Sequence, residues 1–330
     1  VLGAMLMLRA TLAAALTSTT LARREAVGWV YVADPVTKSA ESASWQDIAF
    51  EALDVLVVGP VGLQHCNNTP KVAKAFPWRP RFRCQEPYRR GSFGVADAFR
   101  PRFDALLAVA RQRNPNLQIM ASQWYASHLM EPFGDWGGSL QTLGDSEEQL
   151  DGYTKDVNAF LLEQNMTGYV LDYEGTNVVH WYTRLLVKLA EAFRDPHTGH
   201  RTRHIGISPS TVKYLMGTNS LTDYVFAQTY TQGVELDDFL AIFDANKVFV
   251  GLCPEGCSST NAWDAKDQVE LRDLAGIHVW RLNSDNASTM AKENVVMQQV
   301  HDLFRMASDL EKGKANSRHD SGFFNLLDSL

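Results

Sequence analysis

Eight short apolar segments, separated by amphipathic stretches, constrain the fold of this chain more than any other feature. The segments are rich in Val, Ile, Leu, Phe and Tyr, which favour β-strands. They cover residues 27–32, 53–58, 117–122, 168–173, 204–208, 224–230, 247–252 and 277–280. The helical periodicity between them predicts helices at 95–113, 146–165, 178–194, 236–245, 264–274 and 289–310. Continuous apolar strands that alternate with helices indicate a parallel sheet.

Eight such units in 330 residues, 45% of them hydrophobic, are typical of a single α/β domain with a (β/α)8 TIM-barrel fold. A doubly wound open sheet is the alternative. No glycine-rich phosphate loop follows the first strand, which disfavours a nucleotide-binding version of that sheet. We therefore expect one catalytic barrel over residues 25–310, preceded by a separate segment, 1–24, and followed by a tail, 311–330.

The N-terminal segment has the composition of a targeting sequence. It contains no acidic residue, and Arg9 precedes a run of Ala and Leu that gives way to small polar residues. This pattern predicts a secretory signal cleaved near Ala22, with an organelle transit peptide as the alternative. Sequons at Asn67, Asn165 and Asn286 are compatible with a secreted glycoprotein.

Four cysteines form two local pairs, Cys66 with Cys84 and Cys253 with Cys257. Neither pair has the partner spacing of a zinc site. In an exported protein both pairs are candidates for disulfides, and free buried thiols are the alternative.

Charge and hydropathy narrow the range of partners. The net charge of −7 disfavours nucleic acid and anionic membranes. No apolar run after the N-terminus is long enough to span a bilayer. Several of the eight tryptophans adjoin Gly, Asn or Asp, as aromatic platforms for sugars often do, although core positions explain them equally well. We expect a monomer.

The fourth predicted strand ends with two acidic residues two positions apart, Asp172 and Glu174. Because side chains alternate along a strand, both carboxylates point to the same side. Like charges resist joint ionisation, so at least one of the two is expected to have a raised pKa. That arrangement suits general acid catalysis. A solvated strand end, or an N-cap for the next helix, is the structural alternative.

In such barrels the active site lies at the C-terminal ends of the strands, where this sequence places carboxylates, hydroxyls, amides and aromatic rings. The residues at these ends are Tyr31, Asp34, Ser122, Gln123, Trp124, Asp172, Glu174, Ser208, Gln228, Tyr230, Trp280 and Asn283. No histidine belongs to this set, which disfavours a metal centre. The absence of a Gly-x-Ser-x-Gly elbow disfavours a serine hydrolase.

The fourth strand resembles the signature of family 18 glycoside hydrolases, the chitinases and endo-β-N-acetylglucosaminidases. That signature is Asp-x-x-Asp-x-Asp-x-Glu, with Gly after the first Asp. Gly168, Asp172 and Glu174 match it. Thr167 and Val170 stand where the family has its first two aspartates.

Further segments resemble the same family in order along the chain. Residues 226–230 resemble its sixth strand, 247–252 the seventh strand of plant-type chitinases, and 276–280 the eighth. The third strand departs from the usual Ser-x-Gly-Gly, because residues 121–124 read Ala-Ser-Gln-Trp. The resemblance extends over nearly all of residues 27–310.

The resemblance implies retaining, substrate-assisted hydrolysis of β-1,4-linked N-acetylglucosamine, in chitin-type oligosaccharides or the N-glycan core, without metal or cofactor. Glu174 would be the general acid, and the substrate's acetamido oxygen would attack the anomeric carbon. Asp172 would orient the acetamide N–H, and Tyr230 would hydrogen-bond its oxygen. The expected substrate-binding residues are Gln228 and Trp280, together with Tyr31 and Trp124.

Of the two positions that depart from the family signature, Val170 bears on activity. The family's second aspartate pairs with the third and helps it change orientation, which Val170 cannot do. We therefore expect Asp172 to stay beside Glu174, giving a slower or differently pH-tuned enzyme. The family also includes inactive sugar-binding proteins, which usually lack the glutamate. Because Glu174 is retained, a hydrolase is the preferred reading, and a catalytically weak or inactive carbohydrate-binding protein is the alternative.

Overall fold

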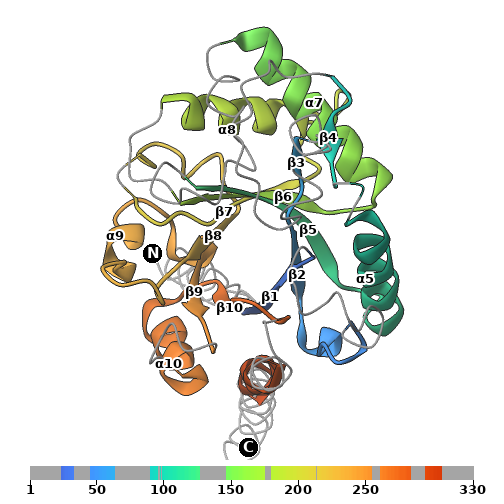
Figure 1. The fold of residues 1–330 in the computed structure, drawn as a ribbon. Helices are drawn as coiled ribbons and strands as arrows, with labels where there is room; N and C mark the ends of the chain where they lie inside the picture. The colour runs from blue at the N-terminus through green and yellow to red at the C-terminus, as the bar shows by residue number, and fades with distance from the viewer. Residues whose placement is uncertain are drawn as a thin grey trace, which may run out of the picture.

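Eight parallel strands close into a barrel in the spatial order β1-β10-β9-β8-β7-β6-β5-β2 (Figure 1). The computed structural model describes residues 24–32, 45–63, 90–126, 146–174, 180–254, 261–283 and 294–306, apart from positions 96, 98 and 213. The barrel strands are β1 (Glu25–Tyr31), β2 (Val55–Gly59), β5 (Gln118–Ala126), β6 (Gly168–Glu174), β7 (His204–Ile207), β8 (Tyr224–Ala227), β9 (Val248–Leu252) and β10 (Gly276–Val279). The predicted (β/α)8 barrel is confirmed, with a strand at each of the eight predicted segments.

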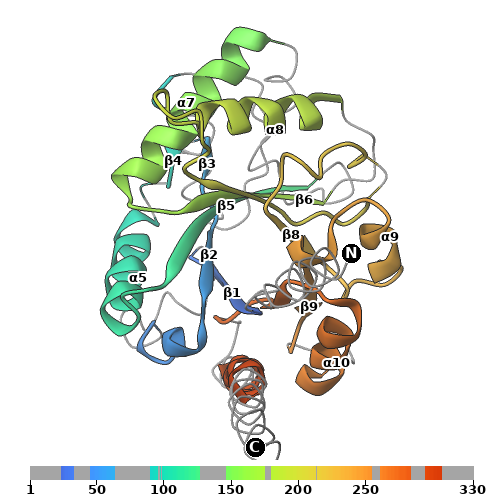
Figure 2. The same ribbon diagram turned by 180° about the vertical axis from the view of Figure 1, so that it is seen from behind.

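Helices cover the outside of the barrel, as the views from both sides show (Figures 1 and 2). They are α5 (Arg100–Arg113), α7 (Glu147–Glu163), α8 (His180–Ala192), α9 (Leu236–Leu240), α10 (Ala262–Arg272) and the 3-10 turns η2 (Phe50–Ala52) and η4 (Ala245–Lys247). Residues 294–306 are also helical. Two short strands, β3 (Gly62–Leu63) and β4 (Phe93–Gly94), pair antiparallel to each other in a separate sheet.

Local sequence signals explain where two helices begin. Ser146 caps α7 by accepting the Gln149 N–H, and two glutamates occupy the first turn, where the helix dipole favours acids. The helix predicted from residue 95 begins only at Arg100. Pro101 lies in its first turn, the helical position that tolerates proline best.

Strand alternation divides the core into two separate clusters. One fills the barrel interior and consists of Val27, Trp29, Val55, Val57, Met120, Val170, Tyr224, Phe226 and Phe249. The other packs between the strands and the surrounding helices and includes Tyr169, Leu171 and Tyr173 of β6. Residues of even number in β6 therefore face inward, so Asp172 and Glu174 continue the row that Val170 begins.

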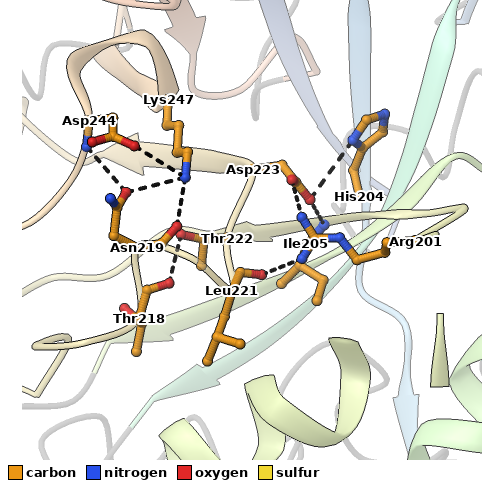
Figure 3. A network of polar contacts seen from close by, with 10 residues as sticks. All are labelled: Arg201, His204, Ile205, Thr218, Asn219, Leu221, Thr222, Asp223, Asp244 and Lys247. Atoms are coloured by element: carbon orange, nitrogen blue, oxygen red, sulfur yellow. Dashed lines mark hydrogen bonds and ion pairs between the residues drawn. The ribbon is translucent and has the colours of Figure 1, made fainter. Parts of the chain in front are cut away.

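The N-terminal ends of β7, β8 and β9 are joined by a polar network (Figure 3). The Asp223 carboxylate accepts the Ile205 N–H at 2.8 Å and pairs with Arg201. Lys247 donates to the Asn219 carbonyl at 2.7 Å. These contacts lie at the end of the barrel opposite to Glu174, where side chains of a (β/α)8 barrel serve stability.

Several predictions concern residues outside the described part of the chain. They include the targeting segment up to residue 23, the tail 311–330, the sequons at Asn67 and Asn286, and Cys66, Cys84 and Cys257. Cys253 is buried directly after β9, and its predicted pairing with Cys257 stays a prediction. Among the described residues, no helix has the length and apolar character needed to cross a membrane.

Candidate active site

The two acids at the end of β6 lie on one side of the strand and share a polar neighbour. Asp172 is buried, with 3% of its surface exposed, whereas Glu174 at the strand end is half-buried. The side-chain amide of Gln228, which follows β8, lies 3.2 Å from Asp172 Oδ1 and 3.5 Å from Glu174 Oε1. An –NH2 group carries two hydrogens, so it can donate to both carboxylates at once. The predicted same-side placement is confirmed.

Ser208, which directly follows β7, completes this cluster. Gln228 Nε2 lies 3.2 Å from Ser208 Oγ and 3.3 Å from its carbonyl oxygen. The Ser208 hydroxyl also hydrogen-bonds Asp172. The ends of β6, β7 and β8 thus supply a carboxylate pair, a hydroxyl and an amide that hold one another in place.

The predicted pKa shift falls on Asp172. Burial raises the pKa of this carboxyl well above its usual range, and the nearby Glu174 carboxylate raises it further. The hydrogen bonds from Ser208 and Gln228 favour the ionised form and offset part of that rise. Asp172 therefore binds a proton more tightly than an ordinary aspartic acid, and its O–H can then donate to a neighbouring carboxylate.

Tyr31 and Trp280 bring two aromatic rings to the same end of the barrel. Burial, followed by the charges of Asp172 and Glu174, raises the pKa of Tyr31. This phenol therefore stays protonated near the two acids and can donate a hydrogen bond. The Trp280 ring lies 6.3 Å from that of Tyr31 and 5.6 Å from that of Trp29, centroid to centroid.

Tyr230 is half-buried shortly after β8, and its ring contacts a histidine that was not predicted. The centroids of Tyr230 and His278 are 6.0 Å apart in an edge-to-face arrangement. His278 is fully buried, and burial lowers its pKa to about 4. It stands two residues before Trp280 in β10, so strand alternation could have placed it inside the barrel beneath the site.

Two polar residues expected at the strand ends have other partners. Gln123 lies on the helix side of β5, where its Oε1 accepts from the Tyr153 and Tyr169 hydroxyls. It follows the inward-facing Ser122 by one position, so alternation turns it away from the site. Asn283 is fully buried and brackets the backbone of Tyr31, with its Oδ1 2.9 Å from the N–H and its Nδ2 2.8 Å from the carbonyl. Asn283 therefore holds the end of β1 in place.

Two other predicted site residues, Trp124 and Asp34, lie partly or wholly outside the described part of the chain. Trp124 lies in β5 and pairs with Asp172 in the β5–β6 register, but its side chain is outside the described part of the structure. Asp34 is outside it entirely. Within the described residues, no three His, Cys, Asp or Glu side chains lie close enough together to hold a metal ion.

No protein-family model and no curated protein sequence matches this chain, but solved structures of chitinases do. A GH18 chitinase from Cycas revoluta in complex with (GlcNAc)3 has 12% sequence identity and a TM-score of 0.58, over 83% of this chain and 98% of that chain. The GH18 chitinase ChiB of Flavobacterium johnsoniae has 12% identity and a TM-score of 0.56, over 84% and 94%. The Group IV chitinase of Ostrinia furnacalis has 13% identity and a TM-score of 0.57, over 86% and 100%.

At these identities the likeness defines the class of fold. The chain is a (β/α)8 barrel of the kind found in GH18 chitinases of a plant, a bacterium and an insect. The matches cover 98%, 94% and 100% of those three chains, so the likeness in fold extends over their whole barrels.

Proposed function

We propose that the protein is a glycoside hydrolase that cleaves β-1,4-linked N-acetylglucosamine with retention of configuration. The observation that carries the proposal is the Asp172–Glu174 pair, bridged by Gln228 at the C-terminal end of the barrel. One carboxyl group of this pair has a raised pKa and the other is half-exposed. That asymmetry provides one shared proton and access to a substrate.

The proton begins on the buried acid and is needed on the exposed one. In the free protein, protonated Asp172 donates its hydrogen to the Glu174 carboxylate. When the acetamide N–H of a bound sugar donates to Asp172, it favours the ionised form of that carboxyl and lowers its pKa. The proton then moves to Glu174, which transfers it to the glycosidic oxygen as general acid.

The substrate supplies its own nucleophile in this scheme. The acetamido oxygen attacks the anomeric carbon, the glycosidic bond breaks, and an oxazolinium forms while ionised Asp172 stabilises its positive charge. Tyr230 hydrogen-bonds the acetamido oxygen and holds it in line for attack. Glu174, now ionised, takes a proton from water, which opens the oxazolinium from the same face as the departed group.

The remaining site residues bind the sugar. Trp280 stacks beneath the ring, as indole faces do with the apolar faces of sugars, and Tyr31 offers a phenolic donor beside the acids. Gln228 contacts the same sugar while it keeps the carboxylates in register. Trp124, on the strand next to β6, is the fourth proposed contact. No step in this scheme uses a metal or a cofactor.

A second function follows from Val170, which is fully buried in the apolar interior cluster two residues before Asp172. Without a second aspartate there, Asp172 has no carboxylate partner below it and stays beside Glu174. The alternative is therefore a catalytically weak or inactive protein that binds N-acetylglucosamine oligomers.

We also propose that the protein is a secreted monomer, with Cys253 paired to Cys257 and Cys66 to Cys84.

Product mapping tests the enzyme proposal. Purified protein is incubated separately with chitin oligosaccharides and with N-glycans that contain a chitobiose core, and the products are identified by mass spectrometry. We expect release from one of the two substrates, and Glu174→Gln should abolish it without loss of folding. If calorimetry shows binding but nothing is released, the protein is the binding protein of the alternative. If Glu174→Gln retains full release, the catalytic assignment is wrong.

A further inference from the structure

The ring of Tyr230 packs against the backbone of Gly251 on the neighbouring strand, β9. We call this position of the ring, against Gly251, the seat of Tyr230. If Gly251 of β9 carried a Cβ, that atom would lie 2.8 Å from both Cδ1 and Cε1 of the Tyr230 ring. Real Cβ atoms do not approach other atoms so closely. The ring therefore lies where the side chain of any other residue at position 251 would begin.

The Ala227 carbonyl oxygen also lies close to Gly251. The hypothetical Cβ of Gly251 would also lie 2.7 Å from the Ala227 carbonyl oxygen. That oxygen accepts a hydrogen bond from Nε2 of His278 at 3.0 Å. His278 is the register partner of Gly251 on β10, so its imidazole reaches across β9 to the end of β8. A side chain at position 251 would therefore press against the oxygen that accepts this hydrogen bond.

The hydrogen bond defines how the imidazole supports Tyr230. Because a carbonyl oxygen can only accept, Nε2 carries the hydrogen, and burial keeps the ring neutral. The same ring meets Tyr230 edge-to-face at 6.0 Å. His278 thereby fixes both the end of β8 and the aromatic ring that follows three residues later.

Thr229 connects the Tyr230 segment to β9 after backbone pairing ends. The last register pair of the two strands is Ala227 with Val250. Beyond it, the Thr229 hydroxyl lies 3.0 Å from the Gly251 N–H and 3.1 Å from the Gly251 carbonyl, and it bonds both. One side chain thus continues the sheet for one more position and sets the direction from which Tyr230 leaves β8.

We infer that Gly251, Thr229 and His278 are positioning residues that hold the Tyr230 hydroxyl at its working place in the substrate site. The inference rests on the proposed function for what Tyr230 does, but the seat itself is a property of the protein without substrate. The hydrogen bonds described above join these three residues to the end of β8 and to the Tyr230 segment, so they act through Tyr230.

The direct test observes the ring of Tyr230. Fluorotyrosine is incorporated in place of tyrosine, the Tyr230 resonance is assigned from its loss in Tyr230→Phe, and its fluorine shift is measured in Gly251→Ala. We expect this resonance to move or broaden. Gly168→Ala is the matched control, because a Cβ there would also lie 2.7 Å from a backbone carbonyl, that of His204, at the opposite end of the barrel. Its Tyr230 resonance should keep the wild-type shift.

A milder substitution covers the case in which Gly251→Ala does not fold. Thr229→Val removes the hydroxyl at nearly constant shape, and Thr229→Ser keeps it. We expect the Tyr230 resonance to move in the valine variant and to return in the serine variant. An unchanged resonance in a folded Gly251→Ala protein, or in Thr229→Val, overturns the inference.

Kinetics give a second readout if the wild-type protein is active. A misplacement of about 1 Å can cost about 100-fold in rate, so Gly251→Ala should lower kcat by that order with a smaller change in KM. In a Tyr230→Phe background the same substitution should cost about threefold or less, because the hydroxyl that it misplaces is already gone. Full additivity of the two losses contradicts the inference. If the wild-type protein is inactive, the proposed hydrolase function is wrong. The fluorine shifts then still show whether Gly251, Thr229 and His278 position the Tyr230 ring.

Discussion

The amide nitrogen of Gln228 lies 3.2 Å from Asp172 Oδ1, so the residue that directly follows β8 holds the buried acid of β6, two strands away in the barrel. The same nitrogen reaches Glu174 Oε1 at 3.5 Å. One amide group therefore lies within hydrogen-bond distance of both acids. An uncharged donor stabilises the ionised form of both acids without adding a third negative charge.

Replacement of Gln228 by methionine should shift the pH dependence of hydrolysis. Methionine keeps the length of the side chain but cannot donate, so the pKa of Asp172 rises further and both limbs of the pH–rate profile move to higher pH. We expect kcat/KM to fall by about 10- to 100-fold, from the loss of hydrogen bonds to charged groups. Gln123→Met is the matched control, because that glutamine faces the helices, and its profile should keep the wild-type midpoints.

Introduction of the family's second aspartate, Val170→Asp, should change both stability and pH profile. Val170 is fully buried, and its Cγ2 lies 3.0 Å from where a Cβ on Gly206 would stand, so a carboxylate there has little room and no exposed surface. We expect a loss of several kcal/mol in the free energy of unfolding and a displaced pH–rate profile. Val57→Asp, in the same interior cluster on β2, controls for destabilisation alone. A Val170→Asp enzyme with unchanged rate and pH profile would show that Asp172 does not depend on its lower neighbour.

His278 should make the barrel less stable in acid. The pKa of His278 is about 4 in the folded protein and 6.5 when the imidazole is exposed. Between pH 6.5 and 4 the imidazole therefore binds a proton in the unfolded chain but not in the folded barrel. The difference of 6.5 − 4 units corresponds to about 3 kcal/mol, lost as the pH falls from above 6.5 to 4. Asp172 acts in the opposite sense, because its raised pKa favours the folded state in acid.

Urea unfolding at pH 7 and pH 4.5 separates these two contributions. His278→Gln lacks the titrating imidazole and retains Asp172, so its free energy of unfolding should fall less with pH than that of the wild type. Equal pH dependence in the two proteins would mean that His278 is already charged, or exposed, in the folded state.

Asp223 should matter for stability and not for catalysis. Asp223→Ala leaves the Ile205 N–H without its acceptor and Arg201 without its ion pair, so we expect a loss of about 1–3 kcal/mol. Asp244→Ala, which removes a mostly exposed partner of Lys247, should cost less than about 1 kcal/mol. Both variants should keep the wild-type kcat and KM. A change of kcat in Asp223→Ala would show that the two ends of the barrel are coupled.

The strands were predictable because apolar runs in a parallel barrel are long, continuous and separated by helices. The placement of Asp172 and Glu174 followed from alternation alone. The same rule, applied at Gln123, would have excluded that residue from the site, since it adjoins the inward-facing Ser122. The sequence indicates where a strand ends but only alternation within it decides which side a residue faces.

Other features of the site depend on side-chain conformations that the sequence does not encode locally. The bridge from Gln228 to both acids requires one particular orientation of a flexible amide. The bracket of Asn283 around the Tyr31 backbone joins residues 252 positions apart. The position of the Tyr230 ring depends on Gly251, which has no side chain to displace it, and on His278, which lies on β10, two strands away from β8. None of these three arrangements corresponds to a pattern of neighbouring residues in the sequence.

β5 and β6 form the longest register in the barrel, from Met120 with Gly168 to Ala126 with Glu174. The acids therefore extend beyond the point at which β6 pairs with β7, yet they stay hydrogen-bonded to a neighbouring strand. For protein engineering, this means that the spacing of the two acids is set by a strand pair and not by the loops that enter or leave it. β5 and β6 would therefore have to be transferred together in any graft of this acid pair onto another barrel.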